Sequence, residues 1–370
     1  VAEYLTTEYT LQSNQSGQIS HLVDEDAYPH AGTMLSNKSD NRKSHHFGEA
    51  SCYAYRHDQR VEAKARPMTT PPFEDRPPSL SDREFALFQK LIYRKAGIHL
   101  APAKKALLEA RLTRRLRELG LHSFEAYYHR VVAVDDSEEL VVLLNRIATN
   151  ETHFFREPKQ FEFVETQIIP AWQSQGHAAN GTRNIRVWSA ACSTGEEPYS
   201  IAMMLWLHFP PGSGWDFEIL ATDISTRVLA AATAAVWPIA KASEIPRDCL
   251  KKFMLKGTGE QNGKMKAGPE IRSVIHFERL NLNDEHYAVE APFDLIFCRN
   301  ALIYFDAQSR ARVIERLLDR LAPNGCLFVG HAESLTGITD RVRYVLPTIY
   351  TNSSQRQPAL KPRSQVASAR

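Results

Sequence analysis

The sequence of 370 residues lacks a long apolar run and a strong net charge of either sign. The longest apolar run of its second half, Ser200–Phe209, is far shorter than the roughly 20 residues that a transmembrane helix needs. The formal net charge is +2, so no global field attracts a nucleic acid or a membrane surface. We therefore expect a protein without direct membrane insertion and without a nucleic-acid partner.

Cysteine is scarce as well, and its spacing fits neither disulfides nor a zinc site. The chain has five cysteines, an odd number, and no C-x-x-C pair. Cys192, Cys298 and Cys326 lie in or beside predicted strands, where small buried thiols are common. The pattern predicts a reduced, cytoplasmic protein with no metal site.

The glycine-rich fingerprints of phosphate binding are also missing, because neither G-x-G-x-x-G nor G-x-x-x-x-G-K-[ST] occurs. In RVWSAACSTGEEPYSIAM, an apolar strand passes into a helix through a turn with one glycine, Gly195, and two acids, Glu196 and Glu197. Such a turn usually holds a nucleotide-like ligand at the carboxyl edge of a parallel sheet. We expect Gly195 to let the backbone approach that ligand. The two carboxylates would repel pyrophosphate and attract a ligand with an ammonium or sulfonium group.

Asp223 ends the next predicted strand, in ATDIS. An acid there suits the two vicinal hydroxyls of a ribose. An aspartate after a strand is equally suited to cap a helix, and the sequence leaves both alternatives open. One ribose acid beside an acidic loop favours S-adenosylmethionine, which has a ribose, a sulfonium and an amino group but no phosphate. A nicotinamide cofactor fits less well.

From about Asn184 predicted strands and helices alternate, as in a doubly wound α/β sheet. The strands are expected at 185–190, 217–222, 274–278, 293–298 and 326–330, and the helices at about 198–208, 225–235 and 307–321. The stretch RVRYVLPTIYTN offers one or two more strands that could close the sheet as an antiparallel edge. The glycines and polar residues of 236–273 predict a small β insertion that lies outside the core.

The composition also separates the rest of the chain. Residues 1–76 are rich in polar residues and poor in aliphatic clusters, which predicts a disordered extension, and Met68 within it is a candidate natural start. The expected organisation is then this extension, an all-α domain at 77–150, a linker and first helix at 151–183, the α/β domain at 184–352 and a disordered tail at 353–370.

The second helical pattern of the all-α domain, about 103–119, is strongly basic. The side chains that can share one of its faces are Lys104, Arg111, Arg114 and Arg115. A solvated helix face is the ordinary explanation of such a cluster. A docking surface for an acidic helical partner is the alternative.

Six stretches, in order and at similar spacing, resemble those of the CheR-type chemotaxis methyltransferases, which methylate glutamate side chains of chemoreceptors. They are TNETHFFRE, RVWSAACSTGEEPYSIAM, ATDIS, NLND, FDLIFCRNALIYF and LFVGHAESL, and the resemblance covers about residues 80 to 350. It implies a class I (Rossmann-like) S-adenosylmethionine methyltransferase domain with an inserted small β-subdomain, preceded by a small all-α domain. The implied products are glutamate methyl esters, for sensory adaptation, and S-adenosylhomocysteine.

The resemblance also implies roles for individual residues. Arg156 and Tyr304 are associated with catalysis, Asp223 with the cofactor's ribose, and Glu197 with its amino group, with Glu196 as a second candidate. The implied cofactor set is Asn150, Thr152, Arg156, Glu197, Asp223, Asn281, Leu282, Arg299 and Asn300. The basic helix, through Lys104, Arg111, Arg114 and Arg115, is expected to engage the helical cytoplasmic domain of a chemoreceptor.

Two further implications concern partners and catalysis. The GTGEQNG loop of the insertion resembles that of members which also bind a receptor's C-terminal peptide tether, whereas KMKAG departs from the usual hairpin. A glutamate carboxylate, with a pKa of about 4.3, is ionised at neutral pH and attacks a sulfonium methyl without a dedicated base.

A non-catalytic S-adenosylmethionine-binding, receptor-interacting protein is the alternative function. The retained residues Arg156, Asp223, Asn300 and Tyr304 argue against it.

Overall fold

The computed structural model describes residues 78–133, 138–174 and 183–353, together with three short strands near the N-terminus. Met68 and the predicted C-terminal tail from residue 354 onward lie outside the described residues. Among the residues that are described, no helix combines the length and the apolar character needed to cross a membrane.

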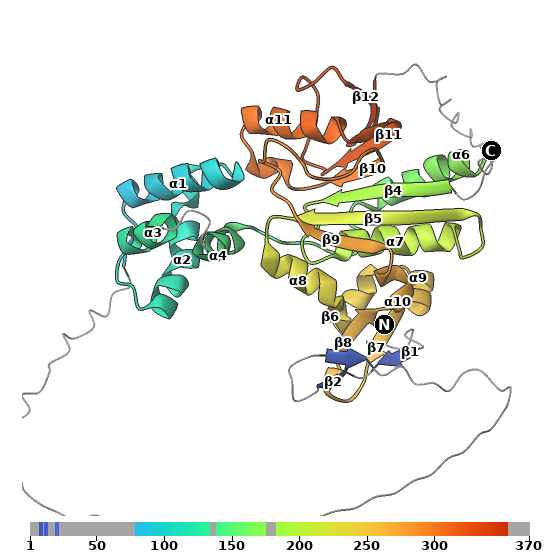
Figure 1. The fold of residues 1–370 in the computed structure, drawn as a ribbon, viewed down its shortest axis with the longest axis horizontal. Helices are drawn as coiled ribbons and strands as arrows, with labels where there is room; N and C mark the ends of the chain where they lie inside the picture. The colour runs from blue at the N-terminus through green and yellow to red at the C-terminus, as the bar shows by residue number, and fades with distance from the viewer. Residues whose placement is uncertain are drawn as a thin grey trace, which may run out of the picture. The chain divides into compact units, whose positions relative to one another are not determined.

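Four helices form the all-α domain that the sequence predicts: α1 (Asp82–Ala96), α2 (Lys105–Leu119), α3 (Phe124–Ala133) and α4 (Glu138–Ile147) (Figure 1). A short 3-10 turn, η2 (Pro102–Lys104), precedes α2. α1 begins with a capping box, in which the Ser81 hydroxyl accepts from the Glu84 backbone N–H and the Glu84 carboxylate accepts from that of Ser81. The helices share one apolar core that includes Phe88, Leu112, Phe124 and Leu143.

The α/β domain is built on a seven-stranded sheet of order β12-β13-β11-β10-β4-β5-β9. The strands are β4 (Arg183–Ala190), β5 (Trp215–Asp223), β9 (Ile275–Arg279), β10 (Phe293–Cys298), β11 (Leu321–Val329), β12 (Val342–Leu346) and β13 (Ile349–Asn352). The first five pair in parallel, and β13 pairs antiparallel with both β11 and β12. The predicted fold class and the predicted antiparallel edge are therefore confirmed.

Two apolar cores lie on opposite faces of this sheet. The neighbouring residues Val187 and Trp188 of β4 belong to different cores, because successive side chains of a strand point to opposite faces. One face is covered by α5 (Pro158–Phe163), η3 (Val164–Ile168), α6 (Ile169–Ser174), α7 (Glu196–His208) and α8 (Thr226–Ala234). The other face is covered by α11 (Ala307–Leu318), which follows the short turn η6 (Leu302–Tyr304) (Figure 1).

The insertion between α8 and β9 forms a small sheet of order β1-β7-β8-β6. Its elements are β6 (Val236–Pro238), η4 (Ile239–Glu244), α9 (Arg247–Phe253), β7 (Met254–Gly257), η5 (Gly259–Gln261), β8 (Lys264–Ala267) and α10 (Pro269–Arg272). The expectation that this segment lies outside the core is wrong. Met254, Met265 and Ile271 are fully buried in the core shared with α7, because apolar residues are interspersed among the polar ones of this segment.

The N-terminal segment differs in part from the disordered extension predicted for it. β1 (Thr7–Tyr9) pairs in parallel with β7, and β2 (Leu11–Ser13) pairs antiparallel with β3 (Ile19–His21). β1 pairs with the edge of a sheet whose residues lie 248 positions later in the chain, which the local composition does not reveal.

Candidate active site

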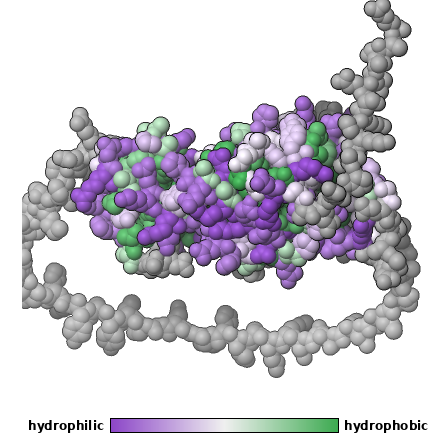
Figure 2. Space-filling view, turned by 90° about the horizontal axis from the view of Figure 1, so that it is seen from above, coloured by the Kyte–Doolittle hydropathy of each residue, from purple (hydrophilic) through white to green (hydrophobic). Residues whose placement is uncertain are grey.

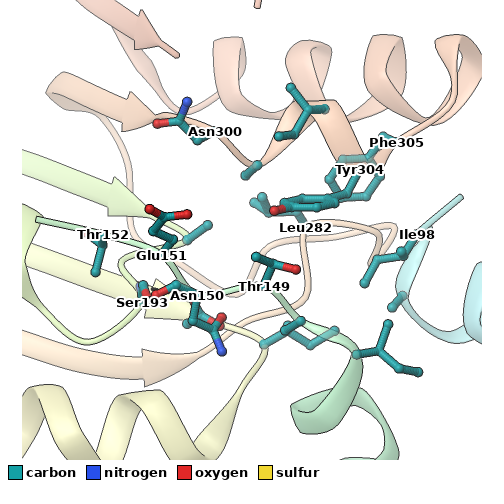
Figure 3. A pocket seen from close by; sticks show the side chains of 18 of the residues that line it. Ile98, Thr149, Asn150, Glu151, Thr152, Ser193, Leu282, Asn300, Tyr304 and Phe305 are labelled. Carbon is teal, nitrogen blue, oxygen red and sulfur yellow. Dashed lines mark hydrogen bonds between the residues drawn. The ribbon is translucent and has the colours of Figure 1, made fainter. Parts of the chain in front are cut away.

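A cavity of about 430 Å³ lies where β4, β5 and β10 end, and residues of the helical domain complete its wall. The chain proceeds from β4 to β5 and β9 on one side and afterwards to β10 and β11 on the other. The cavity thus sits at the point where the strand order reverses, the position at which open α/β sheets bind their ligands. In Figure 3, Asn300, Tyr304 and Phe305 come from one side of the cavity and Thr149, Asn150 and Ser193 from the other.

Most of the residues singled out from the sequence line this one cavity. They are Lys104, Arg111, Asn150, Thr152, Arg156, Glu197, Asp223, Asn281, Leu282, Arg299, Asn300 and Tyr304. Arg114 and Arg115 do not line it. The individual roles given to these residues stay predictions.

Gly195 is required for a different reason from the expected one. Its φ of 95° lies in the left-handed region, where it serves as the N-cap of α7. A Cβ there would lie 3.0 Å from the Cβ of Ala232 and 3.3 Å from the Tyr199 ring. Gly195 is also absent from the lining of the cavity. The close approach that the structure shows is to Ala232 of α8 and to Tyr199.

The structure separates the two neighbouring acids of this turn. The Glu197 carboxylate lines the cavity and accepts from Arg299 Nε and from the Ser189 hydroxyl, both at 2.6 Å. The Glu196 carboxylate accepts from Lys241 Nζ at 2.7 Å and from the Thr194 hydroxyl at 2.6 Å. Since Glu196 is fully buried and outside the lining, its charge is used in packing the insertion against α7.

Arg299 is the second member of a buried ion pair. Its side chain is almost fully enclosed, and Nη1 donates to the carbonyl oxygen of Arg156 and to the side-chain oxygen of Gln160. Paired buried charges need such additional hydrogen bonds to offset their desolvation. Arg299 thus joins the end of β10 to α7 and to the segment that carries Arg156.

Asp223 is a buried acid at the end of β5. Its carboxylate accepts from the backbone N–H groups of Ser193 at 3.0 Å and Ser225 at 2.9 Å. Burial raises the pKa of Asp223, and the N–H groups of Ser225, Ser193 and Ile224 partly offset this. The helix-cap alternative is wrong, because the N-cap of α8 is Ser225, whose hydroxyl accepts from the N–H of Val228.

Asn150 contributes a donor that is still available. Its side-chain nitrogen is buried and finds no hydrogen-bond partner among the described residues, although the residue lines the cavity. Buried amide groups without a partner are rare in folded proteins. Together with the carboxylates of Glu197 and Asp223 and apolar groups such as Leu282, this donor suits a ligand with hydroxyl, ammonium and ring-nitrogen groups. The donor set therefore fits S-adenosylmethionine.

Arg156 is held between two strained residues. Phe155 and Glu157 have φ values of 50° and 59°. The backbone N–H of Phe155 donates to the Ser200 hydroxyl at 2.9 Å, which fixes the segment on α7. Arg156 Nη1 donates to the carbonyl oxygen of Glu151 at 3.1 Å. The backbone thus directs this guanidinium to the cavity.

Tyr304 is held by the helical domain. The His99 backbone N–H donates to the Tyr304 carbonyl oxygen at 2.8 Å, and Ile98 forms an isolated antiparallel bridge with Phe305. Tyr93 donates its hydroxyl to the Asp306 carboxylate at 2.8 Å. The loop that carries Tyr304 is therefore shared between the two domains.

The basic helix does not present one continuous cationic face. Lys104 and Arg111 line the cavity, where Arg111 donates to the Ile147 carbonyl oxygen and, at 3.0 Å, to the Thr149 hydroxyl. Arg114 points to solvent and pairs with Glu118 at 3.2 Å.

Arg115 is turned toward the core of the helical domain. Its guanidinium donates to both oxygens of the Glu139 carboxylate, at 2.9 and 2.6 Å, and the Tyr127 hydroxyl donates to the same group. The predicted common face failed for Arg115 because its partner Glu139 lies on another helix, beyond the reach of helical spacing.

Sequence reasoning missed further lining residues, including Ile98, His99, Leu107, Cys192, Ser193 and Ile303. Ser193 lies in the acidic turn, so its hydroxyl offered a signal. Ile98, Leu107 and Ile303 offered no such signal, because single apolar residues are common at surfaces.

No cluster of metal-binding side chains is present among the described residues.

Comparisons with known proteins cover both domains. Residues 83–148 match the CheR methyltransferase all-alpha domain, and residues 150–351 match the CheR methyltransferase SAM binding domain. The chemotaxis protein methyltransferase of Salmonella typhimurium is 36% identical over 280 residues, which cover 75% of this chain and 93% of the relative. Chemotaxis protein methyltransferase 2 of Pseudomonas aeruginosa is 38% identical over 272 residues, which cover 72% of this chain and 92% of the relative.

Proposed function

This chain belongs to the CheR methyltransferase family, and on that premise we propose that it methylates glutamate side chains of chemoreceptors. Its cofactor is S-adenosylmethionine, and its reaction class is methyl transfer in chemotaxis. The glutamate acceptor, the helical receptor domain as partner and the cytoplasm as location are the finer parts of the proposal. The observation that supports them most is one cavity in which two acids, an unpartnered amide, Lys104 of η2 and Arg111 of α2 meet.

The residues that would hold the cofactor divide by their chemistry. Asp223 is suited to accept from ribose hydroxyls, because its oxygens accept only from backbone N–H groups within the described part of the chain. Glu197 supplies negative charge for the amino group, and Asn150 supplies a donor for a ring or carboxylate acceptor. When bound, S-adenosylmethionine supplies a methyl group on a positively charged sulfur.

The acceptor requires orientation more than activation. A glutamate carboxylate carries its negative charge above a pKa of about 4.3, so no base has to remove a proton from it. Arg156, which lines the cavity with a free part of its guanidinium fork, would orient the carboxylate. Tyr304 would restrict the space beside the reacting atoms. Holding the reactants in line accounts for much of the rate in such reactions.

The inserted β-subdomain is the part that would take a receptor's C-terminal peptide tether. Its strand β7 already pairs with β8 on one side and with β1 on the other. A peptide that adds to β7 would therefore have to replace β1.

Transfer of labelled methyl groups to a purified receptor cytoplasmic domain tests the proposal. We expect base-labile methyl esters with the wild-type protein and a loss of at least about 100-fold in turnover for Arg156→Ala, from lost alignment. Arg343→Ala, which removes an exposed arginine of β12 outside the cavity, is the matched control and should retain activity. Cofactor binding without ester formation would favour the non-catalytic alternative.

A further inference from the structure

Glu333 is a buried acid that the scheme above does not use. We propose that it is a positioning residue for methyl transfer, whose carboxylate fixes the loop 299–305 in the conformation that brings Asn300 and Tyr304 to the cavity. The inference rests on the proposed function insofar as that loop serves the reaction.

The contacts of Glu333 join two separate segments. One oxygen accepts from the backbone N–H groups of Gly330 at 2.6 Å and Asn300 at 2.8 Å, and the other accepts from that of Ile303 at 3.0 Å. Only 3% of the residue is exposed. One side chain that follows β11 therefore holds the backbone of the loop that follows β10.

The loop needs this support because its backbone is unfavourable by itself. Asn300 has a φ of 57°, in the left-handed region that residues other than glycine seldom adopt. Ile303 lies in the single turn η6, whose first N–H groups have no partner within the turn. The Glu333 carboxylate satisfies donors at both places.

Gly330 keeps room for this contact. A Cβ at that position would lie 2.6 Å from the side-chain nitrogen of Asn300, and 2.7 Å from both the Asn300 backbone nitrogen and a Glu333 oxygen. Any side chain there would push the loop and the carboxylate apart. The sequence GHAE therefore combines the acid with the glycine that lets the loop approach it.

The electrostatics of Glu333 support a role in the loop. Burial raises the pKa of Glu333, and the N–H groups of Gly330, Asn300, Ile303 and Leu302 offset only part of this. No cation pairs with it among the residues that the structure describes. A buried carboxylate without a counter-ion is costly unless it is hydrogen-bonded, so its retention depends on the backbone groups that it orders.

The test compares Glu333→Gln with Asp294→Asn. Asp294 is a largely buried acid at the opposite end of β10, and its carboxylate accepts from the Arg186 backbone N–H at 2.9 Å. Each change keeps the side-chain volume and removes the charge, but only the first leaves an NH₂ group facing an N–H group of the loop. Hydrogen exchange of the loop amides, without cofactor, reports on the loop directly, and turnover with the receptor domain reports on the reaction.

In Glu333→Gln we expect the amides of Asn300 and Ile303 to exchange at least about tenfold faster, because local opening becomes easier. We expect turnover to fall at least about tenfold, with the KM for the receptor domain changed less than about threefold. Asp294→Asn should change neither quantity. Gly330→Ala, which crowds the same contact without removing the acid, should also speed exchange of the loop, and it replaces Glu333→Gln if that variant does not fold.

Unchanged exchange of the loop amides in Glu333→Gln and in Gly330→Ala would overturn the proposal. It would also be overturned if turnover fell equally in Glu333→Gln and Asp294→Asn, because the loss would then reflect general destabilisation. If the wild-type protein transfers no methyl group, the proposed function fails, and the exchange measurement still decides whether Glu333 orders the loop.

Discussion

The carboxylate of Glu197 accepts from Arg299 and Ser189 at the wall of the cavity, whereas that of Glu196 pairs with Lys241 away from it. We expect Glu197→Gln to weaken the binding of S-adenosylhomocysteine about tenfold, equivalent to about 1.4 kcal/mol, because it removes the charge that we propose for the ligand's amino group. Isothermal titration calorimetry measures this directly.

Glu196→Gln is the matched control for that change. It removes an acid from the preceding position of the same helix, and it should leave the affinity within about twofold. Equal losses in the two variants would show that the cavity does not distinguish these acids. From the sequence, only the family resemblance ranked Glu197 before Glu196. The structure adds a physical reason, because the Glu196 carboxylate is already paired with Lys241.

We expect Asp223 to make the binding of the cofactor dependent on pH. Because burial raises the pKa of Asp223, its carboxyl takes up a proton at a higher pH than a free aspartate, whose pKa is about 3.9. A protonated carboxyl is a poorer acceptor for ribose hydroxyls. The affinity for S-adenosylhomocysteine should therefore fall as the pH is lowered toward the raised pKa of Asp223. In Asp223→Asn the affinity should be lower at neutral pH and should vary less with pH. A wild-type affinity that is constant down to pH 4 would contradict this role.

At the scale of elements, α2 serves two purposes that its sequence does not separate. Arg115 bonds the buried Glu139 of α4, while Arg114, one position earlier, has a side chain that is 82% exposed. We expect Arg115→Ala to lower the free energy of unfolding by about 1–3 kcal/mol, because the buried Glu139 carboxylate loses its cationic partner and keeps only the Tyr127 hydroxyl. Urea denaturation provides the measurement.

Arg114→Ala should change the free energy of unfolding by less than about 0.5 kcal/mol, as exposed ion pairs contribute little. If the two alanine variants were equally stable, the inward role of Arg115 would have to be abandoned. Helical spacing predicted the four basic residues on one face, but it could not reveal that an acid from α4 would draw one of them inward.

The strands of the sheet were predictable because their apolar runs are continuous and are followed by polar turns. β10 was predicted at its observed bounds, and α11 was predicted three residues too long at its end. The insertion was harder, since the buried Met265 alternates with lysines on β8 and lies between glycines that indicate turns. The cap of α8 was equally hidden, because Asp223 and Ser225 are both favourable capping residues.

At the scale of the whole molecule, the cavity opens between two domains whose rims carry exposed apolar residues. Leu107 of α2 and Ile303 of η6 both line it and are 41% and 47% exposed. The face seen in Figure 2 is largely hydrophilic, with hydrophobic residues scattered over it. The exposed Leu107 and Ile303, beside the cationic residues Lys104 and Arg111, fit an amphipathic, acidic helix as the acceptor.

Leu107→Asp should therefore raise the KM for the receptor domain by about tenfold, because the apolar contact is replaced by a charge that repels an acidic helix. The affinity for S-adenosylhomocysteine should stay within about twofold. Leu207→Asp changes a similarly exposed leucine of α7 outside the cavity and serves as the control. Identical kinetics for both variants would remove Leu107 from the docking surface.

The order of the domains and the edge of the sheet that carries the site followed from the sequence, because alternating strands and helices bring the polar ends of the strands together. The contribution of the helical domain to the cavity could not be predicted from the sequence. It depends on contacts such as Ile98 with Phe305 and Tyr93 with Asp306, which join residues more than 200 positions apart.

Mapping the methylated residues of a receptor cytoplasmic domain by mass spectrometry, after reaction with the purified protein and S-adenosylmethionine, tests the central claim most directly. We expect an added methyl group on glutamate side chains, in base-labile linkage, and at least about 100-fold slower methylation with Arg156→Ala. Methyl groups on other residue types, or a receptor domain left unmodified by a protein that binds the cofactor, would contradict it.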